Sequence, residues 1–155
     1  MDLTSARVIV TEPISDEGME VLAASVRVEP AFGIGREALL DMAPAFDGMV
    51  VRSSTAVDRE LLDRAERLRV VGRAGVGVDN IDVARATSRG VLVVNAPESN
   101  TVSAAEHTLA LMLAVARRLP PVDRELRGGR WAKAITRGVE LAGKVSTAAV
   151  GNCVV

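Results

Sequence analysis

The sequence predicts an α/β fold in which a doubly wound parallel sheet of about five strands is followed by a long crossover helix. Short β-branched runs alternate with helical stretches at the spacing of βα units. A long apolar helical stretch follows the last of these runs. The chain has 155 residues, 48% of them hydrophobic and 25% charged, with a formal net charge of -1. This composition fits one globular domain and a fragment of another.

Five β-branched runs predict the strands, at residues 7–12, 26–30, 47–53, 68–73 and 91–97. Ser15 is expected to cap a helix after the first strand, and residues 35–42 to form a helix after the second. Asp58 is expected to cap the next helix, and Asp79 or Asn80 the helix over residues 81–89. Gly90 supplies the left-handed stop at the end of that helix.

The apolar helix is predicted over residues 103–119. Ser103 and Glu106 have the spacing of a capping box, and Pro120-Pro121 is expected to close the helix. Its segment 109–116 is apolar on every side, so protein must cover both faces. The sequence thus predicts three regions: a lobe of residues 1–98, crossover helices over 99–130, and the approach to a further domain over 131–155.

Composition argues against several classes of protein. Basic residues form no stripe, and with two Phe, one Trp and no Tyr the chain offers few stacking platforms, so we expect no nucleic-acid partner. The longest apolar run, residues 109–116, is too short to span a membrane. Cys153 is the only cysteine, which excludes an internal disulfide and fits a reducing cytoplasm. The N-terminus lacks the pattern of a signal peptide, and we expect no metal site.

The segment "VVGRAGVGVDNID", residues 70–82, nearly contains the dinucleotide fingerprint GxGxxG, but Asn80 replaces the third glycine. About 20 residues further on, Val93 and Val94 stand where an acidic ribose ligand is expected. A nest for an anion is the better interpretation. Gly75 and Gly77 allow positive φ, so the backbone N–H groups around Val76 and Val78 can converge on a carboxylate.

Polar side chains gather where the neighbouring strands end. Arg52 and Ser53 end the third predicted strand, Arg73 ends the fourth, and residues 95–100 follow the fifth. The ends of parallel strands share one edge, where open α/β sheets bind ligands. Two guanidinium groups and a backbone nest at that edge suit a substrate with more than one negative charge.

Other chemistry-bearing residues are better explained by structure. His107, the only histidine, is expected to be packed or close to a helix cap, and Glu106 to act as a cap rather than a base. Cys153 has no basic neighbour that would make it a nucleophile. Trp131 is expected to pack.

Four segments in this order and spacing carry a family resemblance: "VRSST", "GRAGVGVDNID", "NAPESNTVSAAEHTLALMLA" and "GVELAGK". From about residue 6 to Lys144 the chain resembles the NAD-dependent D-2-hydroxyacid dehydrogenases. The resemblance implies a flavodoxin-like substrate lobe, joined by long helices to a Rossmann lobe, with substrate in the cleft between them. It implies that Arg52 and Arg73 serve the phosphate and carboxylate ends of the substrate, and that the Val76-Gly77 backbone binds the carboxylate. It also implies that Val76 borders the nicotinamide and that the loop around Asn100 lies near the cleft.

The sequence departs from this family after "GVELAGK". Members continue with a strand, the GxGxxG motif, an acidic ribose ligand and a catalytic Arg, Glu and His, whereas this chain reads "VSTAAVGNCVV". We therefore expect a truncated chain or a shifted reading frame, with the Rossmann lobe and every catalytic residue absent. Without the His-Glu pair no group takes the substrate proton, and His107 matches a helix position of the family. Loss of the second lobe uncovers segment 109–116, which predicts a marginal chain or self-association through helix 103–119.

Two functions remain open at this stage. The resemblance implies an oxidoreductase that acts on the CH–OH group of 3-phosphoglycerate or another 2-hydroxyacid with NAD as acceptor, in serine biosynthesis. This chain would carry its substrate lobe and be inactive alone. The alternative is a non-catalytic module that binds a hydroxyacid or another anion, or a partner. A flavodoxin-like response or nucleotide module ranks last, because neither a phosphate loop nor an acidic cluster follows the first strand.

Overall fold

The computed structural model describes residues 5–131, 133–144, 149–150 and 153–154. The chain divides into two compact units, Met1–Ser99 and Asn100–Val155, and each is described by itself. No described helix combines the length and the apolar character that crossing a bilayer requires.

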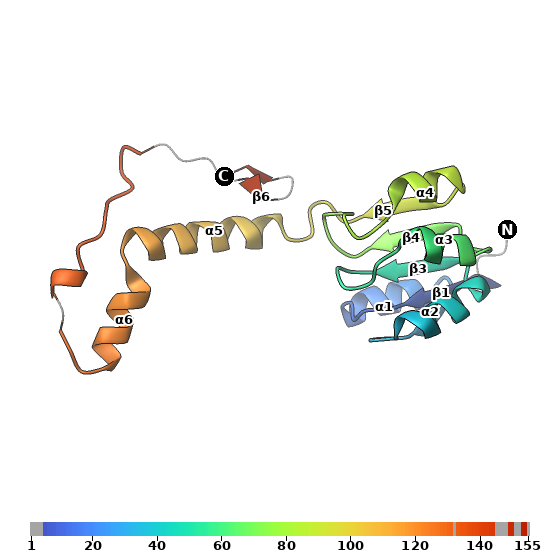
Figure 1. Ribbon diagram of the computed structural model, residues 1–155, viewed down its shortest axis with the longest axis horizontal. Coiled ribbons are helices and arrows are strands. Elements are labelled where there is room, and N and C mark those ends of the chain that lie inside the picture. The colour runs from blue at the N-terminus through green and yellow to red at the C-terminus, as the bar shows by residue number, and fades with distance from the viewer. Residues whose placement is uncertain (1–4, 132, 145–148, 151–152, 155) are drawn as a thin grey trace. The chain divides into compact units, whose positions relative to one another are not determined.

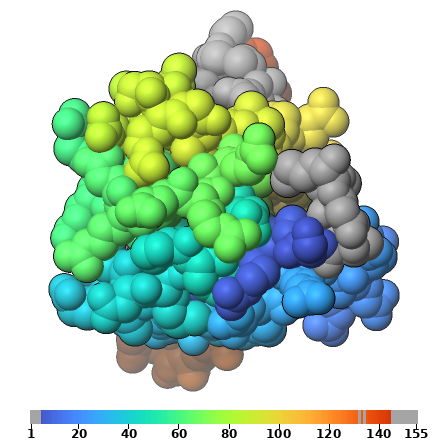
Figure 2. All heavy atoms as spheres, turned by 90° about the vertical axis from the view of Figure 1, so that its right-hand side faces the viewer, coloured from blue at the N-terminus to red at the C-terminus, as the bar shows by residue number. Residues whose placement is uncertain are grey.

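The first unit contains a five-stranded parallel sheet (Figure 1). Its strands lie in the order β2-β1-β3-β4-β5, which is the order of the flavodoxin-like folds. This confirms the predicted α/β class and the parallel sheet. The strand bounds are β1 (Arg7–Val10), β2 (Arg27–Pro30), β3 (Gly48–Val51), β4 (Val70–Arg73) and β5 (Leu92–Asn95). Figure 2 shows the first unit from the side at which its strands begin. The surface colours change from blue and cyan to yellow-green, which follows the strand order.

Helices follow the first four strands. They are α1 (Asp16–Ala23), α2 (Arg36–Met42), α3 (Arg59–Arg64) and α4 (Val83–Ser88), with a 3-10 turn at Ala43–Ala45 after α2. The hydrophobic core combines side chains of the sheet with side chains of α2, α3 and α4, and α1 contributes none. Successive residues of a strand point to opposite faces of the sheet. Ile9, Met49 and Val71 are cross-strand neighbours on one face, and all three are buried.

The helix ends confirm three predictions and correct one. The Ser15 and Asp58 side chains cap α1 and α3 by accepting hydrogen bonds from the amides of Gly18 and Leu61. Gly90 has the expected positive φ of 72°. The cap of α4, however, is Asp82, which accepts from the Arg85 amide at 2.8 Å. Neither Asp79 nor Asn80 caps that helix, because it begins later than predicted.

The second unit contains α5 (Thr101–Ala116), α6 (Leu119–Arg127), a 3-10 turn at Lys133–Ile135 and a short antiparallel pair, β6 (Ala149–Val150) and β7 (Cys153–Val154). Asn100 precedes α5 without a side-chain cap bond, so the capping box at Ser103 and Glu106 is wrong. Pro120 and Pro121 lie at the start of α6 rather than closing α5, and Arg118 between the helices has a φ of 53°. Residues 145–148, 151–152 and 155 of the predicted aberrant tail lie outside the described residues.

Apolar side chains of α5 are exposed along most of the helix. The exposed fraction is 53% for Leu111 and 75% for Val115, and Ala116 is the one buried residue of the helix. His107 is exposed on α5 rather than packed. Trp131 is 74% exposed, so its predicted packing role is wrong.

Candidate functional site

The carboxyl ends of β3 and β4 bring the two predicted arginines to one edge of the sheet. Val51 pairs with Arg73 across these strands, and Arg52 follows Val51 directly. Arg73 also pairs with Asn95 at the end of β5. The backbones of Arg52, Arg73 and Asn95 are therefore neighbours. Of the two guanidinium groups, Arg52 donates to a described residue, whereas no described residue accepts a hydrogen bond from Arg73.

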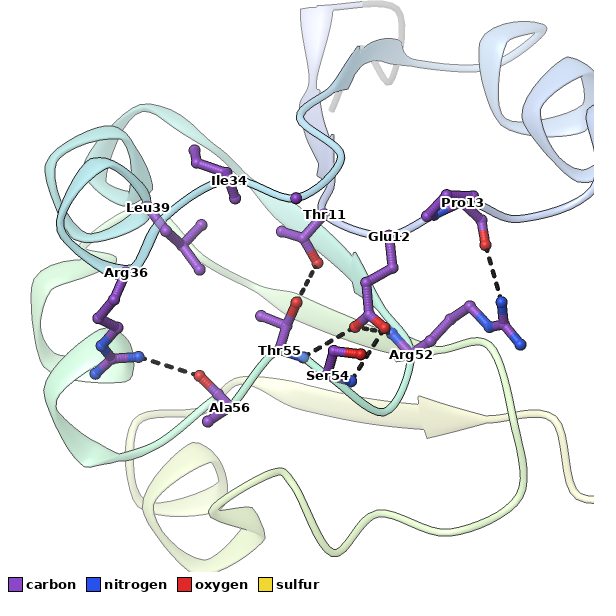
Figure 3. Close-up of a pocket in the computed structure, with 11 residues that line it drawn as sticks. Thr11, Glu12, Pro13, Ile34, Arg36, Leu39, Arg52, Ser54, Thr55 and Ala56 are labelled. Carbon is purple, nitrogen blue, oxygen red and sulfur yellow. Dashed lines mark hydrogen bonds between the residues drawn. The ribbon is translucent and has the colours of Figure 1, made fainter.

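Residues 52–55, here called the Arg52 loop, are held by the carboxylate of Glu12 (Figure 3). Its oxygens accept hydrogen bonds from the amides of Arg52 at 2.9 Å, Ser54 at 3.0 Å and Thr55 at 3.0 Å. Burial alone would raise the pKa of Glu12, but these bonds and one from the Thr55 side chain lower it from 4.5 to about 2. Sequence reasoning missed Glu12, because nothing in its local sequence indicates partners forty residues away.

The side chains of the Arg52 loop point to different surroundings. The exposed Arg52 guanidinium donates from Nη1 to the Pro13 carbonyl at 3.3 Å (Figure 3). Ser53 is exposed and forms no hydrogen bond within the described part of the chain. Its neighbour Ser54 is the serine whose amide anchors the loop.

Asn80 connects the Arg52 loop to residues 74–80, here called the glycine loop. Its Nδ2 donates to the Arg52 carbonyl at 2.8 Å and to the Thr55 carbonyl at 2.7 Å. Its Oδ1 is buried and has no partner among the described residues. Asn80, which replaces the third glycine of the dinucleotide fingerprint, thus has a structural role of its own.

The glycine loop does not adopt the predicted nest geometry. The described glycines with positive φ are Gly33, Gly90, Gly129 and Gly143, so Gly75 and Gly77 are not among them. Both glycines instead make room for a neighbouring side chain. A β-carbon at Gly75 would stand 2.9 Å from Cζ of Arg73, and one at Gly77 would stand 2.7 Å from Oδ1 of Asp79.

The glycine loop nevertheless presents free donors. The amides of residues 76–80 donate no hydrogen bond to any described residue. The Val76 carbonyl is fixed by Nδ2 of Asn95 at 2.6 Å. Arg73 adds a buried Nε without a partner in the described ranges. Because unpaired donors favour an acceptor, this edge suits an anion. The negative charge of the nearby Asp79 carboxylate acts against anion binding.

A cavity of about 550 Å³ lies beside the Arg52 loop (Figure 3). It lies at the ends of β1 and β3, where the strand order reverses. Several of its polar groups already have partners. Thr11 and Thr55 share a hydrogen bond of 2.8 Å, and Arg36 donates to Asp58 at 2.6 Å and to the Ala56 carbonyl at 3.1 Å. The free donors of the glycine loop therefore make the better anion site.

Asn100 belongs to the second unit, where it directly precedes α5. Among the described residues, no group of three or more His, Cys, Asp or Glu side chains is placed to hold a metal ion. The glycine loop departs from the dinucleotide fingerprint at Asn80, whose side chain binds the carbonyls of Arg52 and Thr55.

Comparison with known proteins agrees with this architecture. The model of the family described as D-isomer specific 2-hydroxyacid dehydrogenase, catalytic domain, matches residues 8–154. The chain belongs to this family. The family resemblance stated from the sequence motifs is thereby confirmed.

Two groups of relatives are informative. D-3-phosphoglycerate dehydrogenase of Archaeoglobus fulgidus is 48% identical over 141 residues, which are 90% of this chain and 27% of that protein. The chain thus spans about a quarter of the length of the curated relatives it matches. A crystal structure of a protein from Thermus thermophilus is 33% identical with a TM-score of 0.77, over 88% of this chain and 46% of that one. An NADPH-dependent glyoxylate/hydroxypyruvate reductase from Sinorhizobium meliloti, solved with NADP and malonate, is 29% identical with a TM-score of 0.68, over 87% and 42%.

Proposed function

We propose that this chain carries the substrate-binding lobe of an NAD-dependent 2-hydroxyacid dehydrogenase. The observation that supports this proposal most is the row of free amides at residues 76–80 beside the unpaired Nε of Arg73. These donors stand at the carboxyl edge of a sheet with the strand order of ligand-binding folds. The preferred ligand is 3-phosphoglycerate, because the named relatives at 45–48% identity are D-3-phosphoglycerate dehydrogenases.

The arrangement suggests how the two ends of this ligand are bound. The substrate carboxylate accepts hydrogen bonds from the amides of Val76 and Gly77, with the Arg73 guanidinium beside it. The phosphate binds Arg52 and Ser53, since the exposed bond of Arg52 to the Pro13 carbonyl at 3.3 Å can be exchanged for a charged acceptor.

Oxidation of the ligand's CH–OH group requires a hydride acceptor, and NAD supplies this chemistry when bound. Val76 is proposed to border the nicotinamide, while the dinucleotide itself is held by residues other than the glycine loop. The printed sequence has one histidine, His107, which is exposed on α5. We therefore propose that a polypeptide of these 155 residues binds hydroxyacid without oxidising it. A role in serine biosynthesis and a cytoplasmic location belong to the same proposal.

Titration calorimetry of the purified chain with 3-phosphoglycerate tests the site. Binding heat is expected, and Arg52→Ala or Arg73→Ala should weaken binding by about tenfold or more, the effect of a lost charged hydrogen bond. Arg27→Ala is the matched control, because this exposed arginine begins β2 at the opposite edge of the sheet. It should leave the affinity within about twofold of the parent value.

Two results would contradict the proposal. Absence of heat at millimolar 3-phosphoglycerate would remove the substrate site. NADH formation by the purified chain would remove the claim that it is inactive alone. We expect this polypeptide to bind 3-phosphoglycerate without turnover in the presence of NAD. The alternative function, a non-catalytic hydroxyacid-binding module, predicts the same result.

We also propose a partner for this chain, namely a second copy of itself. The exposed apolar side chains of α5 favour self-association of the chain through this helix. Val102, Leu109, Leu111, Leu113 and Val115 are between 42% and 75% exposed.

A further inference from the structure

We infer that Asn80 is a positioning residue that holds the Arg52 loop and the glycine loop in one fixed arrangement for ligand binding. The inference rests on the proposed function, because it assigns to these loops the two ends of one ligand. Asn80 itself need not touch that ligand.

The contacts of Asn80 reach both ends of the Arg52 loop. One Nδ2 group carries two hydrogens, and both are used, toward the carbonyls of Arg52 at 2.8 Å and Thr55 at 2.7 Å. The Asn80 carbonyl also accepts from the Val57 amide at 2.8 Å. The residue that ends the glycine loop therefore fixes the loop that carries Arg52.

Glu12 holds the same loop through groups of the opposite polarity. It binds amides of the Arg52 loop, whereas Asn80 binds the carbonyls. The loop is thus fixed to β1 through Glu12 and to the glycine loop through Asn80. Loss of Asn80 should leave the Arg52 loop held by Glu12 alone, so the loop should open more often and move relative to the Val76 and Gly77 amides.

The buried Oδ1 of Asn80 indicates which substitutions are informative. This oxygen has no donor within the described residues. Asn80→Asp retains the shape but turns acceptors toward two carbonyls, so it removes both bonds and adds repulsion. Asn80→Ala removes the bonds alone, and Asn80→Ser, with one hydroxyl donor, should give an intermediate effect.

Amide hydrogen exchange without ligand tests the bracing directly. In Asn80→Ala, exchange at the Ser54 and Thr55 amides should rise about tenfold, the effect of losing one to two hydrogen bonds, while the buried Val71 amide is unchanged. Asn95→Ala is the matched control. Its Nδ2 binds the Val76 carbonyl at 2.6 Å and no other described residue, so Ser54 and Thr55 should keep their parent exchange rates. Unchanged exchange in the folded Asn80 variants would overturn the inference.

A double-mutant cycle with Arg52→Ala then tests the link to the ligand. Asn80→Ala should weaken 3-phosphoglycerate binding about tenfold in the parent chain and less than about twofold when Arg52 is already Ala. Equal losses in both backgrounds would show that Asn80 does not act through Arg52 and would overturn its positioning role. If the parent chain itself gives no binding heat, the proposed function fails, and the exchange rates still decide whether Asn80 braces the loop.

Discussion

The carboxylate of Glu12 is the most strongly perturbed group that the structure describes, and it stands next to the proposed phosphate end of the site. Burial would raise its pKa, but the amides of Ser54, Arg52 and Thr55 outweigh burial and lower the pKa to about 2. A carboxylate with a depressed pKa stabilises the folded chain above its unfolded pKa of about 4.5. This contribution is lost as pH falls from that value through about 2.

Glu12→Gln should therefore lower the free energy of unfolding at pH 7 by roughly 1–2 kcal/mol after allowance for solvent screening. The difference between the parent chain and the variant should shrink between pH 4.5 and 2, because the parent protonates there. Urea denaturation across this pH range measures it. Glu17→Gln, an exposed change in the first turn of α1, is the control and should cost less than about 0.5 kcal/mol. A loss that stays constant down to pH 2 would contradict the assignment of the stability to this carboxylate.

At the scale of elements, Asp58 joins two helices. Its side chain caps α3 through the Leu61 amide at 3.0 Å and accepts from Nη2 of Arg36, the first residue of α2, at 2.6 Å. Asp58→Ala should cost about 1–2 kcal/mol, the usual effect of losing a cap. Asp58→Asn keeps a cap acceptor and should cost less than about 1 kcal/mol. Urea denaturation compares the pair, and equal losses would mean that the Arg36 pair, not the cap, supplies the stability.

The strands were predictable because β-branched runs between turn residues have few other structures available. The caps at Ser15 and Asp58 were predictable because their partners lie three residues away. The predicted caps at Asp79 or Asn80 and at Ser103 were wrong for one reason. Both helices begin elsewhere than predicted, since α4 begins at Val83 rather than residue 81 and α5 at Thr101 rather than residue 103, and no side chain caps α5.

The candidate site shows the same division. Arg52 and Arg73 could be placed at one edge, since parallel strands share the edge where they end. The reason for glycine at positions 75 and 77 could not be predicted, because it depends on how the Arg73 and Asp79 side chains fold back. Asn80 was noticed only as a missing glycine, since its partners lie 25 and 28 residues earlier in the chain.

For the whole molecule, hydrophobic burial is unevenly distributed. The main core cluster lies entirely in the first unit, while α5 in the second unit leaves large apolar side chains exposed. At about 25 cal/mol per Å², a few hundred Å² of such surface is worth several kcal/mol on association. This favours contact between copies of the chain.

We expect the purified chain to form dimers or larger species at concentrations on the order of 100 μM, as measured by light scattering. Leu111→Gln combined with Val115→Gln should shift this equilibrium toward monomer, because the two residues are one turn apart on α5. Val21→Gln, at a 67% exposed position of α1, is the control and should leave the association unchanged. A monodisperse parent monomer with a sharp thermal transition would contradict the expectation.

The pairing of Val51 with Arg73 has a consequence for how such a site can change over evolutionary time. Consecutive residues of a strand face opposite sides, so one inserted or deleted residue within β4 would exchange the side from which this arginine emerges. The connections before β4 and after β5 can vary in length without this effect. The parity of the four-residue strand β4 therefore fixes the face of the sheet from which Arg73 emerges, and only paired insertions or deletions in β4 preserve it.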